Sequence, residues 1–218
     1  KLEEFLQIDG HSRQNLELTQ TIRDGKKTGS LLGVLDYTAT SMGARLLRAY
    51  LEKPLLNREK IVARQDAVEA LWKDTALRLD LAAVLGEVYD LERLLGRLVT
   101  GSGNARDLLA LAESLGKIPA IQGLFANDPA PLLTTLVQDL DPLVDFVDLI
   151  KRAIVDQPAI TLRDGNLIRD GYHAELDKLR QARRGGKDWI RDLEATERQR
   201  TGIKSLKEGF NRGFGYYL

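Results

Sequence analysis

The sequence contains no cysteine and only two histidines, His11 and His173, which lie far apart along the chain. The absence of cysteine excludes disulfides, thiolate metal sites and cysteine nucleophiles, and it is typical of proteins in a reducing compartment. Neither histidine has the close-set carboxylate or thiol partners that a metal site needs. We therefore expect no metal site and no thiol chemistry in this chain.

A net charge and long apolar runs are also missing. Lys+Arg and Asp+Glu both number 32, so any affinity for nucleic acid must come from a local excess of one sign. No run of about 18 apolar residues occurs, and no basic segment followed by an apolar one opens the chain, so neither a membrane span nor a signal peptide is predicted. The expected location is cytoplasmic. Because the chain starts at Lys1 without a methionine and closes on apolar residues, we expect it to be part of a longer protein.

Aromatic residues make up only 6% of the chain, whereas leucine is abundant and recurs at helical spacing. This pattern predicts a mainly α fold with short connections that favour antiparallel packing of helices. A short helix is expected within Asp9 to Ile22. The best candidates for later helices are Leu77 to Leu85, Asp90 to Val99, Ala105 to Leu115 and Leu143 to Ile154.

Two further helices have clear boundaries in the sequence. Thr40 or Ser41 can cap a helix that must end before Pro54, because proline disfavours helical geometry in the residue before it. Asn57 can cap the next helix. The apolar positions of that helix lie on a single stripe, which we expect to be buried: Ile61, Val68, Leu71 and Trp72.

The segment from Gly171 to about Arg200 contains no proline and carries apolar residues on a heptad line. At 1.5 Å per residue, a continuous helix of this length would reach roughly 45 Å, more than a compact domain needs. We predict a protruding helical arm with a kink or break at Gly185-Gly186, because each glycine costs about 1 kcal/mol relative to alanine.

Aromatic residues and glycines are interleaved from Thr201-Gly202 to the C-terminus. This composition predicts two short strands joined by a turn near Asn211-Arg212-Gly213. Because an isolated hairpin is only marginally stable, we expect the rest of its sheet in sequence beyond Leu218.

Two glycine-rich segments resemble nucleotide-binding loops but lack what such loops need. Residues 101–106 lack the third glycine of the dinucleotide fingerprint, and they follow a predicted helix where a strand is required. Residues 25–28 echo the end of a phosphate loop, yet Gln20 stands where that loop requires glycine. No carboxylate is embedded in an apolar run of the kind that acid–base catalysis uses. We expect ordinary loops, no bound cofactor and no catalytic residue.

The charges are distributed unevenly near the C-terminus. From Arg180 to Arg212 the chain has ten basic residues and five acidic ones, and these cations are spaced so that they can contact phosphates. The same pattern is compatible with a solvated helix stabilised by pairs such as Glu194–Arg198. The aromatic residues nearby can stack on bases, although in a hairpin they more often cover one face of a small sheet. Charge alone therefore leaves both interpretations open.

Several blocks of the sequence are familiar in their residues, their order and their spacing. They are FLQID (5–9), SRQNLEL (12–18), SLLGVLD (30–36), TSMGARLL (40–47), YLEKPL (50–55), RQDAV (64–68), DLERL (90–94), ERQRTGIKSLK (197–207) and GFNRGFGYY (209–217). Together they resemble the core domain and the start of the clamp in the bacterial MutS family of DNA mismatch-repair proteins. The resemblance covers essentially the whole chain and is weakest from about Leu115 to Leu140.

This resemblance implies a helical core, or lever, domain over residues 1–170. Residues 171–218 would be the lever helix and the N-terminal part of the clamp domain, so that a small β segment ends a mainly α fold. The fragment itself would be no enzyme and hold no cofactor, whereas the parent protein would be an ATPase that uses ATP and magnesium in another domain. The parent would form a homodimer, work with a MutL-type partner in the nucleoid-associated cytoplasm, and hold the backbone of double-stranded DNA without reading its sequence.

The candidate contacts to the DNA backbone follow from charge. We select first the cations of the expected hairpin, and second two cations of the arm: Lys204, Lys207 and Arg212, then Lys187 and Arg191. Two alternatives stay open. One is a MutS paralogue that acts in recombination or on stalled ribosomes, against which the passage Thr201 to Lys204 argues. The other is a helical scaffold that binds protein through the heptad seam.

Overall fold

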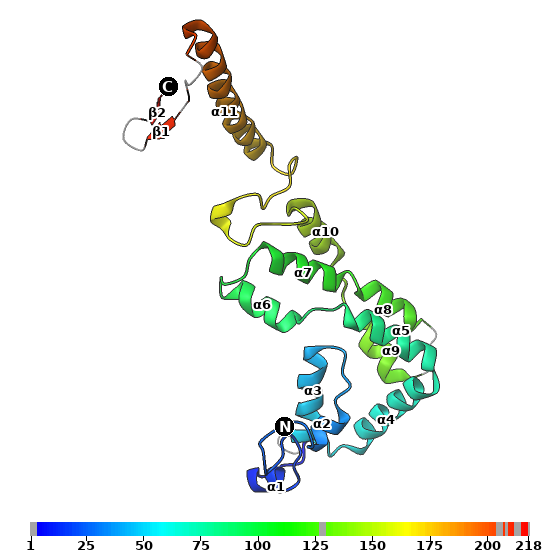
Figure 1. The fold of residues 1–218 in the computed structure, drawn as a ribbon. Coiled ribbons are helices and arrows are strands. Elements are labelled where there is room, and N and C mark those ends of the chain that lie inside the picture. Colours follow the sequence, from blue (N-terminus) through cyan, green and yellow to red (C-terminus); the bar gives the residue numbers. More distant parts are fainter. Residues whose placement is uncertain (1–3, 127–129, 204–206, 208, 212–214, 218) are drawn as a thin grey trace. The chain divides into compact units, whose positions relative to one another are not determined.

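The computed structural model describes residues 4–126, 130–203, 207, 209–211 and 215–217, without the side chains of 187–191, 210, 211 and 215–217. The chain divides into two compact units, Lys1–Leu167 and Ile168–Leu218, here called unit 1 and unit 2. The described residues are mainly helical, as the leucine spacing predicts (Figure 1). None of the helices described is both long and apolar enough to cross a membrane.

Unit 1 begins with three helices, α1 (Gly10–Asn15), α2 (Leu31–Leu35) and α3 (Ser41–Glu52). The short helix predicted within Asp9 to Ile22 is α1, which ends well before Ile22. Glu17 adopts a positive φ of 46°, which ends helical geometry there. The backbone N–H groups of Leu31 and Leu32 instead donate to the carbonyls of Glu17 and Leu18, at 3.0 and 2.9 Å. The segment after α1 therefore pairs with the start of α2.

Helix α2 packs unusually close to the loop before it. The hydroxyl of Ser30, which is fully buried, accepts from the Gly33 N–H at 3.2 Å and donates to the Lys27 carbonyl at 2.6 Å. A Cβ added to Gly33 would lie 2.2 Å from that carbonyl oxygen, far inside any real contact distance. Glycine is therefore required at position 33 by the approach of two backbones.

Four helices form a second group within unit 1: α4 (Arg58–Lys73), α5 (Thr75–Gly86), α8 (Ile118–Leu124) and α9 (Pro131–Gln138). Helix α4 contacts α5 and α9, and α5 contacts α8. The prediction of a buried stripe on α4 is wrong, because Val68 is 66% and Trp72 is 72% exposed. The buried residue of α4 is Ala67, so its packed face lies beside the apolar stripe.

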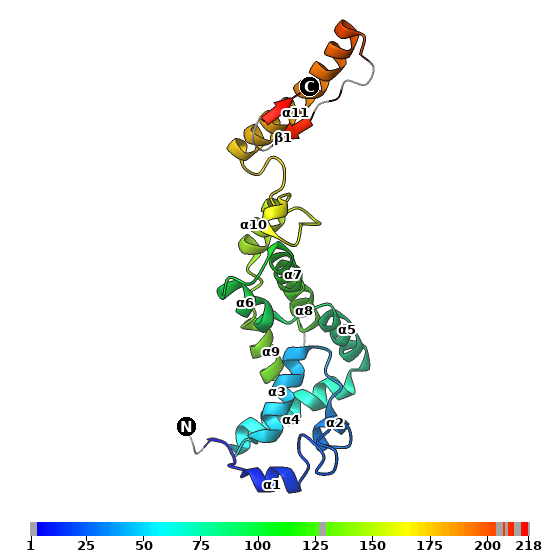
Figure 2. The ribbon, with the colours of Figure 1, turned by 60° about the vertical axis from the view of Figure 1, so that its left-hand side comes forward.

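The third group, here called the central layer, consists of α6 (Leu91–Val99), α7 (Ala105–Leu115) and α10 (Val144–Ala153). Helix α7 packs against both α6 and α10 (Figures 1 and 2). The predicted bounds of α7 are confirmed, and α6 and α10 lie within their predicted ranges. Residues 101–104 form a loop between α6 and α7, as expected. The apolar centre of this layer is Leu94, Leu111, Leu115, Val147 and Ile150, all of them buried.

Unit 2 contains one long helix, α11 (Ala174–Thr201), of 28 residues, which corresponds to about 42 Å. It runs through Gly185-Gly186 without interruption, so the predicted break is wrong. Two glycines weaken a helix by about 2 kcal/mol, and the strong helix formers on either side offset that cost. The helix ends at Gly202, whose positive φ of 71° is the left-handed geometry that glycine adopts most readily at a helix C-terminus.

Two strands of three residues follow, β1 (Gly209–Asn211) and β2 (Gly215–Tyr217). They pair antiparallel with Phe210 opposite Tyr216. The predicted turn includes Arg212, which lies outside the described residues. The assignment of this segment to a clamp stays a prediction.

Candidate nucleic-acid interface

The start of α11 is fastened to the segment before it by Arg180. Its guanidinium donates to the Asp170 carboxylate at 2.6 Å and to the Ile168 carbonyl at 2.9 Å, and its side chain is only 22% exposed. The Gly171 N–H donates to Asp177 at 3.0 Å, and His173 caps the helix. Arg180 therefore has a structural role at the base of α11, and it is a poor candidate for phosphate contact.

The far end of α11 carries ion pairs within the helix. Arg198 lies 2.5 Å from Glu194, which confirms the pair that the sequence suggested, and Arg200 lies 2.6 Å from Glu197. The hydrogen bond from Arg200 lowers the pKa of the Glu197 carboxyl, and the same bond raises the pKa of Arg200. Part of the local basic excess is therefore balanced on the helix itself.

Of the five predicted contact residues, the described part of the chain includes the side chain of Lys207, which is exposed. Lys187 and Arg191 belong to α11, but their side chains are not described. Lys204 and Arg212 lie outside the described residues. The structure therefore leaves the proposed contacts untested, apart from showing that Lys207 is accessible.

The helical backbone nevertheless groups some of these cations. Positions 183, 187 and 191 recur every four residues on α11, so Arg183, Lys187 and Arg191 share one side of the helix. Arg183 is exposed and makes no ion pair with any described residue. These three residues belong to the same local excess of basic residues in the sequence as the cations of the hairpin segment.

In unit 1, acidic and basic residues occur together, as a surface cleft shows. A surface cleft of about 550 Å³ in unit 1 is lined by two arginines, Arg93 and Arg106, and by several carboxylates, including Glu113. Its mixed charge favours neither an anion nor a cation. Among the described residues, no group of three or more histidines and carboxylates is arranged to hold a metal ion.

One cluster that sequence reasoning missed surrounds Arg45 on α3. Its two terminal nitrogens donate to the Asp90 carboxylate at 2.8 and 2.7 Å, and its Nε donates to Glu92 at 2.9 Å. The hydrogen bonds from Arg45 hold the pKa of Asp90 at about 2, below its ordinary value of 3.8. A pattern of charges on residues that are neighbours in the sequence cannot reveal a contact between two residues 45 positions apart. The available signal was that Arg45 and Asp90 both lie in the blocks that carry the family resemblance.

Comparison with known proteins covers nearly the whole chain. A family described as MutS domain III matches residues 11–211. The chain is 50% identical over 217 residues to the DNA mismatch repair protein MutS of Clostridium perfringens, covering 100% of this chain and 24% of that protein. It is 52% identical over 215 residues to the MutS of Brevibacillus brevis and 51% identical over 215 residues to that of Symbiobacterium thermophilum, with 99% of this chain and 25% of each relative covered. The chain thus spans about a quarter of the length of these relatives. The extent of the match and these identities confirm the resemblance read from the sequence blocks, and the chain belongs to the MutS family as its domain III.

Proposed function

We propose that this chain is the helical core of a DNA mismatch-repair protein, in which unit 2 holds the backbone of double-stranded DNA and unit 1 connects it to an ATPase domain elsewhere in the polypeptide. The observation that carries this proposal is the uninterrupted α11, which leads directly into the hairpin segment with Lys204, Lys207 and Arg212. The relatives are named DNA mismatch repair proteins, and this name is the reason for proposing DNA as the ligand.

A continuous helix is well suited to join two distant functions. Its backbone hydrogen bonds fix both the distance and the rotation between its ends, so a displacement at its base reaches its tip about 42 Å away. Arg180 fastens that base to residues 168–170. A mechanical link of this kind needs no bound cofactor within the chain.

Contact with phosphates would account for the excess of lysine and arginine near the C-terminus. Phosphate contacts position a protein on the duplex but carry no sequence information, which suits a protein that holds DNA of any sequence. As parts of the same proposal, the parent protein would bind ATP and magnesium in its ATPase domain, act as a homodimer at the nucleoid, and cooperate with a MutL-type partner.

The test neutralises the hairpin cations in a protein that carries the whole clamp. Lys204→Gln, Lys207→Gln and Arg212→Gln together should weaken binding to matched and mismatched duplex about equally. Each phosphate contact contributes roughly 0.9 to the slope of log affinity against log salt, so three contacts should flatten that slope by between about two and three. Fluorescence anisotropy over a salt series measures this slope.

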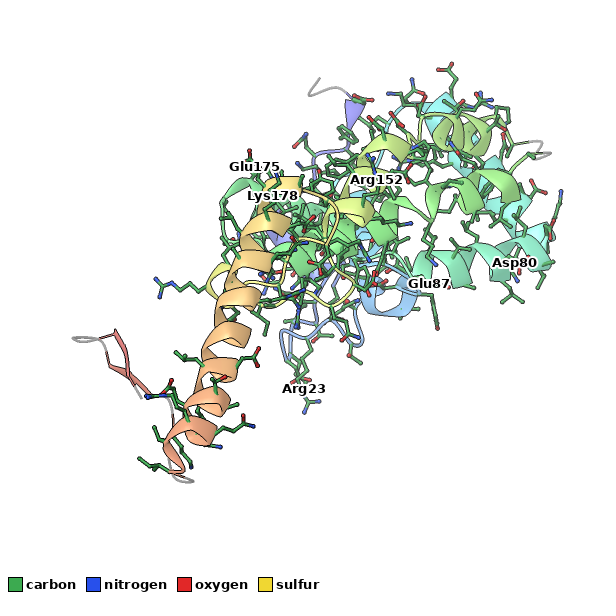
Figure 3. All side chains as sticks on the ribbon, turned by 90° about the horizontal axis from the view of Figure 1, so that it is seen from above. Arg23, Asp80, Glu87, Arg152, Glu175 and Lys178 are labelled. Carbon is green, nitrogen blue, oxygen red and sulfur yellow. The ribbon has the colours of Figure 1, made fainter. Side chains whose placement is uncertain are left out.

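A control with the same change in charge comes from unit 1. Arg23, Lys26 and Arg152 are exposed cations, of which Figure 3 labels Arg23 and Arg152. Replacing these three by glutamine should leave the slope unchanged. An unchanged slope in the hairpin variant would show that these residues do not contact phosphate. A loss confined to mismatched duplex would show that the hairpin reads the lesion.

The second candidate is a helical scaffold that binds protein through the heptad seam of α11. It is favoured by Leu179, a residue of that seam that is 68% exposed. Leu179→Glu should then abolish capture of a helical partner and leave the salt dependence of DNA binding intact. The paralogue alternative is less favoured, because the relatives quoted above are named as mismatch-repair proteins.

A further inference from the structure

The first part of unit 1 is a separate layer that long side chains connect to the rest. We call residues 4–56, with α1, α2 and α3, the N-terminal layer. Its ladder contact, between Phe5 and Leu55, is internal to the layer. Its polar contacts toward α4 include a Glu4–Lys60 ion pair and the stacking of the Arg64 guanidinium 3.6 Å from the centre of the Tyr50 ring.

Toward the central layer, the N-terminal layer extends Arg45. The guanidinium binds Asp90 as a fork, in which each terminal nitrogen donates to a different carboxylate oxygen at 2.8 and 2.7 Å, and Nε donates to Glu92. A planar fork fixes the direction of approach as well as the distance, which a lysine ammonium cannot do. The contact is therefore directional, although Arg45 itself is half-exposed.

Asp90 is itself held in place from the other side. It is the N-cap of α6 and accepts from the Arg93 N–H at 3.2 Å, so the carboxylate is fixed relative to that helix. The preceding N–H, of Tyr89, donates to the buried Ser114 hydroxyl on α7 at 3.0 Å. The connection between α5 and α6 is thus hydrogen-bonded to α7 of the central layer, right next to the residue that binds Arg45.

From this geometry we propose that Arg45 is a positioning residue that locks the N-terminal layer to the central layer through Asp90, so that the two move as one body. Without the fork, the N-terminal layer keeps its contacts to α4 and swings about them relative to α6. This inference concerns unit 1 alone and does not depend on DNA binding, so it stands or falls separately from the proposed function.

The chain has no cysteine, so two introduced cysteines can carry spin labels without background labelling. Val34→Cys on α2 and Val99→Cys on α6 place the labels at exposed positions, 62% and 84% accessible, one in each layer. Pulsed electron double resonance then gives the distribution of the distance between the labels. With Arg45 intact we expect one narrow distribution. In Arg45→Gln its width should increase roughly twofold as a second arrangement becomes populated.

Three further variants separate the lock from general loosening. Asp90→Asn keeps the cap, because asparagine caps a helix as well as aspartate, but it removes the charged half of the fork. It should broaden the distribution as Arg45→Gln does. Arg48→Gln, also on α3, breaks an ion pair with Glu52 on the same helix and should change nothing. Asp74→Asn alters the N-cap of α5, which makes no fork, and should also change nothing.

The outcomes divide cleanly. Broadening in both fork variants with none in the two controls supports the lock. A distribution as narrow in Asp90→Asn as in the unaltered chain overturns it, and this variant decides the question if Arg45→Gln loses its helical circular dichroism. Equal broadening in all four variants also overturns the proposal, because it would show that any change of charge loosens unit 1.

Discussion

Replacing Gly185 and Gly186 together by alanine should stabilise α11. Both lie in the helix interior, and a Cβ added at either position meets nothing within 4 Å. Neither position has a positive φ, so alanine introduces no backbone strain. Each replacement should therefore recover about 1 kcal/mol of helix propensity, or about 2 kcal/mol for both. Since 1.4 kcal/mol corresponds to a factor of ten, local opening of the helix should become roughly 30-fold rarer.

Amide hydrogen exchange followed by mass spectrometry measures this opening directly. Peptides from the middle of α11 should exchange roughly 30-fold more slowly in the double variant, because exchange there proceeds through local unfolding. Peptides from unit 1 serve as the internal control and should not change. Unchanged or faster exchange in α11 would refute the reasoning, because it would mean that the helix is already interrupted at the glycines, as the sequence alone predicts.

Three other predictions concern stability and activity. Gly33→Ala should destabilise unit 1 by about 1–2 kcal/mol in urea unfolding, since overpacking against the Lys27 carbonyl outweighs the gain in helix propensity; a neutral result would contradict the close backbone approach. Asp36, bound by Lys27, and Asp90 have a folded pKa of about 2 against an ordinary 3.8. The unfolded state binds more protons between these values, so thermal stability should fall as pH drops from about 4 to about 2, less steeply in Asp36→Asn. Finally, the purified chain should neither bind nor hydrolyse ATP, which turnover that stays with the chain through repeated purification would disprove.

Helix starts were predictable because capping is local chemistry. Thr40 and Asn57 each accept a hydrogen bond from a backbone N–H three residues later, at 3.0 and 2.9 Å. Such a bond depends on residue type and on the next turn of chain, both of which the sequence contains. The start of α7 has a similar local cause, because the side chains of Asn104 and Asp107 form a capping box.

Burial was less predictable, because spacing shows that a stripe exists and not which neighbour covers it. Val68 and Trp72 share a stripe on α4, yet both are exposed, whereas the neighbouring Ala67 is buried. The choice between adjacent faces depends on the positions of α5 and α9, which no local pattern encodes. A helix that is apolar on its exposed flank therefore misleads a prediction based on periodicity alone.

The candidate site, too, could be predicted only in part from the sequence. The basic excess near the C-terminus is a property of composition and could be predicted in full. The allocation of individual cations required distances, since Arg180 serves the base of α11 while Lys207 is exposed. The Arg45 fork could be identified only in the folded structure, because packing brings Arg45 and its partners together.

The continuity of α11 also restricts how its length can change between related proteins. One inserted residue would turn everything after Gly202 by about 100° around the helix axis and advance it by about 1.5 Å. An insertion of seven residues would lengthen the arm by about 10 Å and turn its end by only about 20°. Helical phase thus favours insertions and deletions in α11 whose lengths are close to whole numbers of turns, such as about 7, 11 or 18 residues, and disfavours lengths that turn the end of the helix to another side.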